Sequence, residues 1–449
     1  MRTFWLPLLG LVVLSVSASA EEPAAVATEK PAADRAEPAK KTKSIVTAIL
    51  EAALGIDTAS DSAQPGEDSA PPAAATHEQV AAVVVKGEQG ATLQTLSATP
   101  DGKIVGLIAP ARHAPIGVSG RTAAPSEIRL FDSEGRQLER WSLSFRGQSV
   151  GVGPDGVIYA AGDGRVARYD GQGKLLSDVE LPHLAEVLKD QDALKKKAEE
   201  QLKQEQQSLA NSKKVYEQII KQLEEKQART EIEEQQLKSY KSYLDNFDQQ
   251  AAAYKDRKIE DVIQQITGRL RTINGIAATE KDVYIACGEL VGYGYAIWRL
   301  DPELKSAQRV LGPVSGCCGQ MDIQASGNHF YLSENTKKRV AQYDRDGKLV
   351  SAFGKSGRES EGLSFGGCCN PMNCRVCASG ELLTAESEGI VKRFSATGEF
   401  LGLVGYAKLT GGCKNVAVAA SPKGDRVYFC DLPGSRIIIL GAKKSEAAE

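Results

Sequence analysis

Short apolar runs separated by turns rich in Gly, Asp and Pro recur along most of this chain. The clearest recurrence joins Gly316–Gly354 to the segment that starts at Gly367. Each has a Cys pair, a turn Gly, a strand ending in Glu, a strand with basic residues and a last strand closing on Gly. A repeat of about 40–50 residues made of four short strands is typical of a propeller blade. The pattern therefore predicts a ring of four-stranded sheets.

The repeat can be traced through residues 79–182 and 268–441, and it predicts six blades. The sixth repeat, which starts near Cys413, is one strand short at its end. An open sheet edge at the seam would be a pairing hazard, and the β-branched strand Val80–Val85 has no place in the first repeat. We therefore predict that Val80–Val85 pairs with Arg436–Leu440 and closes the ring.

A different pattern interrupts the repeats in residues 183–267, which contain neither Gly nor Pro. Apolar residues recur there every seven positions, at Leu202, Leu209, Tyr216 and Leu223 and again at Leu237 and Leu244. This spacing is typical of a coiled coil. Because the repeats on either side must still stack, the helical segment has to return to its starting point, with a turn between Glu225 and Glu231. The predicted fold is an all-β six-bladed propeller with an inserted antiparallel α-helical coiled-coil hairpin.

The two ends of the chain read differently from the repeats. Residues 1–20 carry Arg2, an apolar stretch and a small-residue ending, which is the pattern of a secretory signal peptide. Residues 21–78 are rich in Ala, Pro and Glu and are predicted to be a disordered linker, and residues 442–449 form a charged tail. The apolar stretch is too short to span a bilayer, and no later segment is long enough. We expect a secreted or periplasmic protein without a transmembrane segment after signal cleavage.

Composition narrows the possible functions. The 449 residues include 55 basic and 58 acidic side chains, a formal net charge of −3, so nothing in the charge balance favours nucleic acid as a partner. Only four His are present, which argues against chemistry that needs clustered imidazoles. Neither a Ser–His–Asp set nor a phosphate-binding loop is evident.

Carboxamides recur near the start of the innermost strand of each repeat. That strand lines the central channel of a propeller, so these side chains could form a ring of donors and acceptors at one mouth. One hypothesis is a polar ligand or an ion on the axis, and the other is that the amides bind backbone groups or ordered water. The candidates are Gln94, Gln148, Asn274, Gln320, Asn373 and Asn415.

Most of the nine cysteines fall in the connections between repeats. Disulfides between neighbouring loops, vicinal disulfides within each Cys pair, a metal or iron–sulfur site, and unmodified thiols all remain open. The candidates for disulfide or metal binding are Cys317, Cys318, Cys368, Cys369, Cys374 and Cys413.

The repeat resembles the NHL family of six-bladed β-propellers, which is related to TolB-like and gluconolactonase-like propellers. The resemblance is carried by Tyr331–Asn335, Arg339-Val340 and Asp344–Leu349, and again by Gly380–Glu386. It implies the propeller fold, but the Cys pairs and the helical insert depart from the usual repeat. The architecture serves binders, scaffolds and enzymes alike.

Acidic residues end three of the second strands, at Glu334, Glu386 and Asp431. The resemblance to gluconolactonase-like propellers implies that they could ligate a divalent cation at the channel mouth. The simpler interpretation is that each accepts hydrogen bonds from the following loop in repeat after repeat.

The preferred functional hypothesis is a non-catalytic binding or scaffolding propeller that uses the coiled coil to bind a protein partner or to self-associate. The alternatives are a metal-assisted hydrolase or lactonase at the channel, and a metal-binding or redox protein based on the cysteines. No cofactor is required by the sequence, although a divalent cation in the channel fits the second hypothesis.

Overall fold

The structure is a computed structural model that describes residues 75–110, 126–247, 251–252, 257–291, 294–317, 321–357, 362–367, 369–410 and 416–444. The predicted signal peptide, almost all of the predicted linker and most of the predicted tail lie outside these residues. The chain divides into two compact units. We call the described residues of Ser62–Gln201 and Lys258–Glu449 the sheet unit, and those of Leu202–Arg257 the helical unit.

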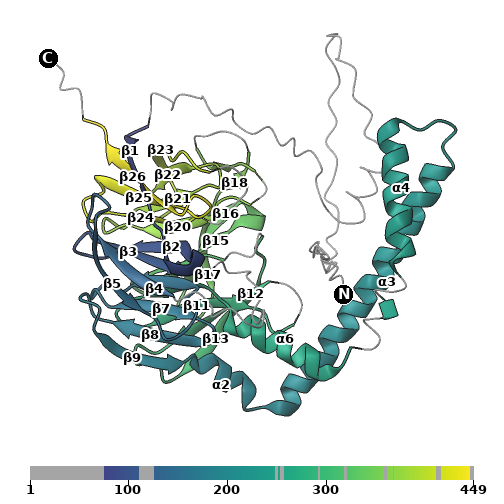
Figure 1. Ribbon diagram of the computed structural model, residues 1–449, viewed down its shortest axis with the longest axis horizontal. Coiled ribbons are helices and arrows are strands. Elements are labelled where there is room, and N and C mark those ends of the chain that lie inside the picture. Colours follow the sequence, from purple (N-terminus) through teal and green to yellow (C-terminus); the bar gives the residue numbers. More distant parts are fainter. Residues whose placement is uncertain are drawn as a thin grey trace, which may run out of the picture. The chain divides into compact units, whose positions relative to one another are not determined.

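The described residues of the sheet unit form six four-stranded antiparallel sheets and one small two-stranded parallel sheet (Figure 1). The mostly β architecture predicted from the repeats is thereby confirmed. Sheet 1 contains β2 (Thr92–Ala98), β3 (Ile104–Ala109), β4 (Glu127–Phe131) and β5 (Gln137–Ser142), and sheet 2 contains β6 (Ser149–Val152), β7 (Ile158–Gly162), β8 (Arg165–Tyr169) and β9 (Leu175–Glu180). Sheet 3 contains β10 (Ile273–Ala278), β11 (Val283–Gly288), β12 (Tyr295–Leu300) and β13 (Ala307–Val314), and sheet 4 contains β14 (Ile323–Ser326), β15 (His329–Glu334), β16 (Arg339–Asp344) and β17 (Leu349–Phe353). Sheet 5 contains β20 (Asn373–Val376), β21 (Leu382–Ala385), β22 (Ile390–Phe394) and β23 (Phe400–Tyr406), and sheet 6 contains β24 (Val418–Ala420), β25 (Arg426–Asp431), β26 (Arg436–Ala442) and β1 (His77–Val84).

The first strands of the six sheets lie next to one another in a closed series. Strand β2 contacts β6, β6 contacts β10, β10 contacts β14, β14 contacts β20, β20 contacts β24, and β24 contacts β2. Such a circle of antiparallel sheets around one axis is a β-propeller. The two-stranded sheet of β18 (Lys355–Ser356) and β19 (Ser364–Phe365) lies outside the repeat and was not predicted.

Burial falls from the axis to the rim and explains the alternation of the sequence. Every residue of the second strand β3 is buried, whereas the outer strand β5 is almost entirely exposed. Apolar side chains of neighbouring sheets fill the space between them; Leu93 and Ile104 of sheet 1 share one cluster with Tyr428 and Ile437 of sheet 6. Each fully buried aliphatic side chain contributes roughly 1.5–3 kcal/mol, so these inter-sheet layers hold the ring together.

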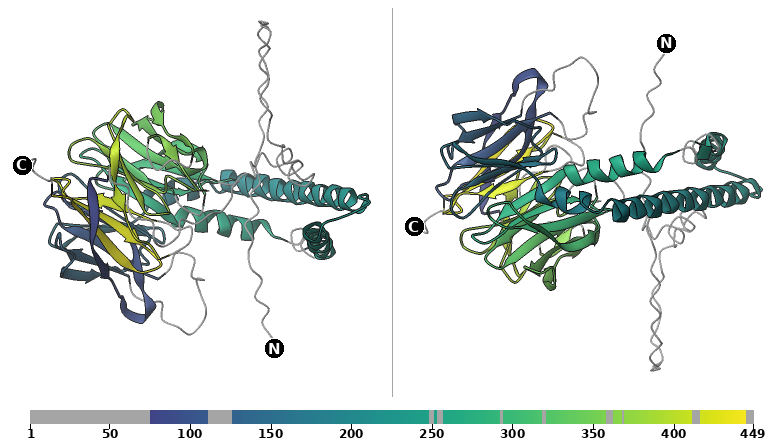
Figure 2. Two further views of the ribbon diagram at one scale, coloured as in Figure 1. Left: turned by 90° about the horizontal axis from the view of Figure 1, so that it is seen from above. Right: turned by 90° about the horizontal axis from the view of Figure 1, so that it is seen from below.

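Strand β1 closes the ring, as predicted. It pairs antiparallel with β26, from Val84 opposite Arg436 to His77 opposite Ala442, with an irregularity at Val80. Figure 2 shows the N-terminal strands in purple beside the C-terminal strands in yellow. Ser435 adds a second connection, because its Oγ donates to Val85 O at 2.5 Å and accepts from Leu93 N at 2.9 Å. The prediction placed this strand a few residues late, at Val80–Val85.

The first and last helices of the inserted segment belong to the sheet unit, and their ends lie close together. It begins with α2 (Pro182–Leu188) after β9 and ends with α6 (Ile259–Arg271) before β10. Gly164 N donates to Arg271 O at 3.0 Å and Leu181 N donates to Gly164 O at 2.8 Å, so one turn of sheet 2 holds both ends. His183 Nε2 lies 2.9 Å from Leu270 O in a buried setting. The expectation that the insert must return to its starting point is confirmed.

The helical unit consists mainly of the later residues of α3 (Gln191–Glu224) and of α4 (Glu231–Asp245). The turn between them falls where the sequence placed it, and Thr230 begins α4 with a capping box: its Oγ1 accepts from Glu233 N, and Glu233 Oε2 accepts from Thr230 N. The two helices run antiparallel, since Glu224 pairs with Lys241 while the ring of Tyr216 contacts that of Tyr243 at a tilt. Their shared apolar cluster contains Ile219, Ile220, Leu223 and Leu237.

The returning arm of the helical segment is divided, a feature that the predicted hairpin did not include. Helix α4 ends at Asp245 with Asn246 as its C-cap, and α6 begins afresh at Ile259. Asp261 accepts the Lys258 backbone N–H at 3.2 Å and so starts a separate helix. The seven-residue apolar spacing had ended before this break, which explains why the returning arm is not one rod.

Candidate functional site

The axis of the sheet unit is the candidate site. The strand register does not place the six predicted amides at equivalent positions around it. Within sheet 5, Asn373 pairs with Ala385, and Asp322 holds the equivalent position in sheet 4 because Ile323 pairs with Leu332 and Cys374 with Thr384. The predicted Gln320 therefore lies two positions too early. It falls outside the described residues, as does Asn415.

The other three amides lie one position before that of Asn373. The residues aligned with Asn373 are Thr95, Ser149 and Gly275, which pair with Leu107, Ala161 and Ala286. A strand irregularity at Gln94 and another at Asn274 shift the side chains locally. Alignment of the repeats on their turns could not reveal these shifts. The predicted equivalence of Gln94, Gln148 and Asn274 with Asn373 is therefore wrong.

Two of the amides bind backbone of the next sheet. Gln148 Oε1 accepts from Ile273 N at 2.9 Å, and Asn373 Oδ1 accepts from Val418 N at 3.0 Å. Asp322 does the same with its carboxylate, because Oδ2 accepts from Cys374 N at 2.9 Å. These contacts favour the interpretation that the polar side chains link neighbouring first strands. Gln94 bonds within its own sheet, to Thr92 and to Ala109 O.

A small polar cavity of about 30 Å³ lies on the axis among the first strands. Its size admits one or two water molecules, since a water needs roughly 10–15 Å³ measured in this way. Burial raises the pKa of Asp322 to about 6, and the hydrogen bond from Cys374 N and the charge of Arg375 only partly offset that rise. The cavity is lined by residues of all six sheets, including Gln94, Ser149, Asn274, Asp322, Gln324, Asn373, Arg375 and Val418.

A larger cavity of about 540 Å³ opens on the side where the first strand of each sheet turns into the second. We call it the mouth cavity. Arg375, Gln324 and Ile276 line both cavities and so form the boundary between them. The six turns that surround the mouth cavity contribute, among others, Pro100, Pro154, Lys281, Asn328, Cys377 and Pro422.

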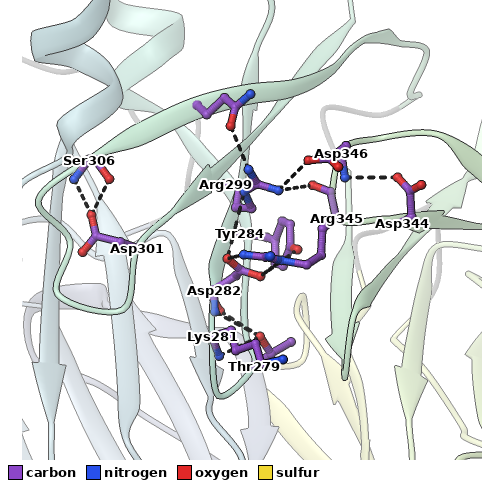
Figure 3. A network of polar contacts seen from close by, with 11 residues as sticks. Thr279, Lys281, Asp282, Tyr284, Arg299, Asp301, Ser306, Asp344, Arg345 and Asp346 are labelled. Carbon is purple, nitrogen blue, oxygen red and sulfur yellow. Dashed lines mark hydrogen bonds and ion pairs between the residues drawn. The ribbon is translucent and has the colours of Figure 1, made fainter.

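One wall of the mouth cavity is fixed by a polar network between sheets 3 and 4 (Figure 3). The Arg345 guanidinium donates to both carboxylate oxygens of Asp282, at 2.7 and 2.8 Å. Hydrogen bonds with Thr279 close the turn that carries Asp282, and this turn presents Thr279 and Lys281 to the cavity. The hydrogen bond to Asp282 raises the pKa of Arg345 above its usual value.

The acids that end the second strands serve the fold. Glu334 accepts from Arg339 and from Tyr343 OH, Glu386 pairs with Lys392 at 2.8 Å, and Asp431 pairs with Arg436 at 2.6 Å. All three carboxylates are at most 2% exposed. Burial alone would raise the pKa of Glu334, but the hydrogen bonds from Arg339 and Tyr343 outweigh it and leave the pKa below its usual value. Each carboxylate is thus already bound by a basic residue of the following strand.

The cysteine candidates separate into two places. Cys317 and Cys369 bring their sulfurs to 3.2 Å across the loops before sheets 4 and 5. Cys374 packs instead in the cluster of Tyr331, Val340 and Phe365, and burial raises its pKa well above the usual value. The remaining candidates, Cys318, Cys368 and Cys413, lie outside the described residues.

Sequence reasoning missed Asp322 and Arg375. Each carries a charge on an innermost strand, where the other sheets place uncharged residues such as Ser149, Gly275 and Ala417. A charge inside an apolar strand pattern is the signal that could have found them. Among the described residues, no group of three or more His, Cys, Asp or Glu side chains is placed to hold a metal ion. In the described part of the chain, no helix has both the length and the apolar character needed to cross a membrane.

The strand order and the axial cavities define a β-propeller with a polar axis. No model of a known protein family matches this chain, and no curated protein matches it. Similar solved structures include a streptogramin B lyase (12% identity, 82% of this chain and 97% of that chain, TM-score 0.41) and the WD40 repeats of RRP9 (10%, 83% and 100%, 0.41). A calcium-binding regucalcin from Agrobacterium tumefaciens str. C58 is also similar (12%, 80% and 93%, 0.40). These scores are too low to carry an argument, so the fold assignment rests on the chain's own strand order.

Proposed function

We propose that this chain is an exported, six-bladed propeller with NHL-like repeats that binds a protein partner and performs no catalysis. The observation that supports this best is the use of its recurring polar groups. Gln148, Asp322 and Asn373 bind backbone of the next sheet, and the recurring acids are bound by basic residues. The axial cavity of about 30 Å³ has room for water but not for an organic substrate.

The binding surface proposed here is the helical unit, in which α3 and α4 form an antiparallel coiled coil. Ile232 in the first turn of α4 is 69% exposed, more than any other large apolar side chain among the described residues. An exposed apolar side chain among charged neighbours, here Glu231, Glu233 and Glu234, is typical of a contact point for a partner protein.

A photo-crosslinking amino acid at position 232 of the full-length chain, expressed in its own host, tests this proposal. Irradiation should give a discrete crosslinked species, either with a second copy of the chain or with another protein. The matched control is position 175 on the outer strand β9, where Leu175 is 51% exposed. Equal crosslinking at both positions, or none at position 232, would contradict the proposed surface.

An enzymatic role at the axis is supported only by Asp322, a buried carboxylate whose pKa of about 6 suits proton transfer near neutral pH. The amide and carboxylate oxygens of the axial cavity could also face a divalent cation. Arg375 lines the same cavity, and its positive charge opposes a cation there. Elemental analysis of the purified protein decides the point, since a stoichiometric divalent metal would favour the enzyme.

We also propose a disulfide between Cys317 and Cys369 in the exported protein. A disulfide has its sulfurs about 2.0 Å apart, so the pair at 3.2 Å needs a shift of only about 1 Å. The two thiols would give up two protons and two electrons to a disulfide-bearing oxidant, as is usual in oxidising compartments. Peptide mapping without reductant should recover the two segments linked, and alkylation of both thiols in the exported protein would contradict the bond.

A further inference from the structure

The mouth cavity has the dimensions and the construction of a ligand site. Its volume of about 540 Å³ lies within the range of roughly 300–1,000 Å³ usual for small-molecule pockets. Six turns from six different sheets surround it, and the Asp282–Arg345 pair fixes the turn that carries Lys281. The cavity therefore exists before any ligand arrives, which lowers the cost of binding.

Arg375 lies at the inner end of this cavity and has spare hydrogen-bond donors. Its Nη1 donates to Gln324 Oε1 at 3.1 Å and its Nη2 donates to Ala98 O at 3.3 Å. Both acceptors are neutral. A guanidinium carries five N–H donors, so three remain without a partner among the described residues.

Arg375 also differs from several other arginines of the sheet unit in its charge environment. Arg345, Arg339 and Arg436 each contact a carboxylate. None of the ion pairs among the described residues includes Arg375, and burial lowers its pKa. The charge of Asp322 in the axial cavity offsets this effect only in part. An anion that contacts the guanidinium directly would relieve the remaining cost.

The surroundings select the kind of anion. Arg375 and Lys281 are positive, while Glu280 at the rim and Asp322 in the axial cavity are negative. This balance suits one negative charge better than the two of a phosphate ester. Proline, valine and isoleucine side chains form much of the wall, which suits an apolar body. A planar carboxylate matches the donor geometry of a guanidinium.

We propose that the mouth cavity binds a small organic carboxylate, with its carboxylate on the Arg375 guanidinium and its apolar body against Ile276, Val376 and the prolines of the turns. This site is separate from the partner surface proposed for the helical unit, and its test does not depend on that surface.

The test uses the full-length chain and a matched pair of probes, benzoate and its neutral analogue benzamide. Calorimetric titration should show benzoate binding to the wild type at least about tenfold more tightly than benzamide, as expected for one charge-assisted contact. Arg375→Gln should weaken benzoate binding by at least about tenfold and leave benzamide binding unchanged.

Arg393→Gln is the matched control, because Arg393 lies on β22 of the same sheet in a half-exposed ion pair with Glu381. It should leave benzoate binding unchanged. If Arg375→Gln does not fold, a crystal of the wild type soaked in benzoate decides, with density expected in the mouth cavity against Arg375. Equal affinity for both probes, no binding of benzoate, or benzoate density elsewhere only would overturn the proposal.

Discussion

Charged side chains are paired differently at the ends of the second strands and at the axis of the sheet unit. At the ends of the second strands, Glu334, Glu386 and Asp431 each have a basic partner from the next strand. At the axis, Asp322 and Arg375 line one cavity, yet the ion pairs of the described residues include neither of them. A pairing that recurs from sheet to sheet belongs to the architecture. Asp322 and Arg375 occur only once, and each offsets the charge of the other only in part. They mark the place where this propeller departs from its own repeat.

The largest predicted effect follows from the removal of Lys392, the basic partner of Glu386. Lys392 is fully buried, pairs with Glu386 at 2.8 Å and donates to Ser364 O. Burial raises the pKa of Glu386 even with Lys392 beside it. Lys392→Met leaves this carboxylate buried without a counter-ion and should lower the free energy of unfolding by about 3–5 kcal/mol, measured by chemical denaturation.

Two further variants separate charge from packing. Arg393→Met removes the neighbouring half-exposed ion pair with Glu381 and should cost about 1 kcal/mol or less. The double variant Lys392→Met/Glu386→Gln should recover much of the loss, since it removes both charges. If the double variant is as unstable as Lys392→Met, packing and not charge explains the effect.

The second prediction concerns Asp322 at the axis. Its substitution should raise the free energy of unfolding at neutral pH, whereas Lys392→Met should lower it. Because the pKa of Asp322 is raised to about 6 from its usual 3.8, the folded state binds the proton more tightly than the unfolded state does. Its ionised form therefore lowers stability above about pH 6, and this penalty fades as the pH falls towards 4. Asp322→Asn should stabilise the protein at pH 7.5 by about 2–3 kcal/mol more than at pH 4.

The control for this pH dependence is Asp132→Asn. Burial of Asp132 is outweighed by the hydrogen bonds from Arg136 and Glu134, so the pKa of Asp132 is lowered. Its substitution should therefore cost more at pH 7.5 than at pH 4. An Asp322→Asn effect that does not change with pH would show that the axial carboxylate is as well solvated as a surface one.

The smallest predicted effect concerns Thr230, an uncharged helix cap in the helical unit. Thr230 caps α4 through its hydroxyl, and Thr230→Ala should lower the stability of that unit by about 1 kcal/mol. Hydrogen exchange of the first-turn amides of α4 should report the loss, while amides of the sheet unit keep their protection. Thr230→Ser, which retains the hydroxyl, serves as the control and should change little. Equal exchange in the alanine variant and the wild type would mean that Thr230 does not fix this end of the helix.

Much of the fold could be predicted because it depends on local patterns. The alternation of apolar runs and turns identified the repeats, and the missing last strand of sheet 6 identified β1 as its partner. The turn between α3 and α4 followed from the need for the inserted segment to return to its starting point. The break at Asn246 carries no Gly or Pro and was missed.

The candidate site was predicted less well, because it depends on register. Alignment on turns placed Gln320 where the ladder places Asp322, a difference of two residues. Irregularities at Gln94 and Asn274 moved these amides away from the position of Asn373. The mouth cavity could not be foreseen, since it is assembled from six turns far apart in the sequence. The sequence also does not show which partners the donors of Arg375 have.

The pairing of β1 with β26 also sets the order in which this protein can mature. The two strands of that ladder are separated by about 350 positions of chain, so the earliest strand has to wait, with its edge unsatisfied, until nearly everything else has been synthesised. A ribosome-bound nascent chain therefore cannot complete the circle. For the exported protein proposed above this delay would be useful, because a chain that cannot close early stays open enough to pass through a translocation pore and fold on the far side.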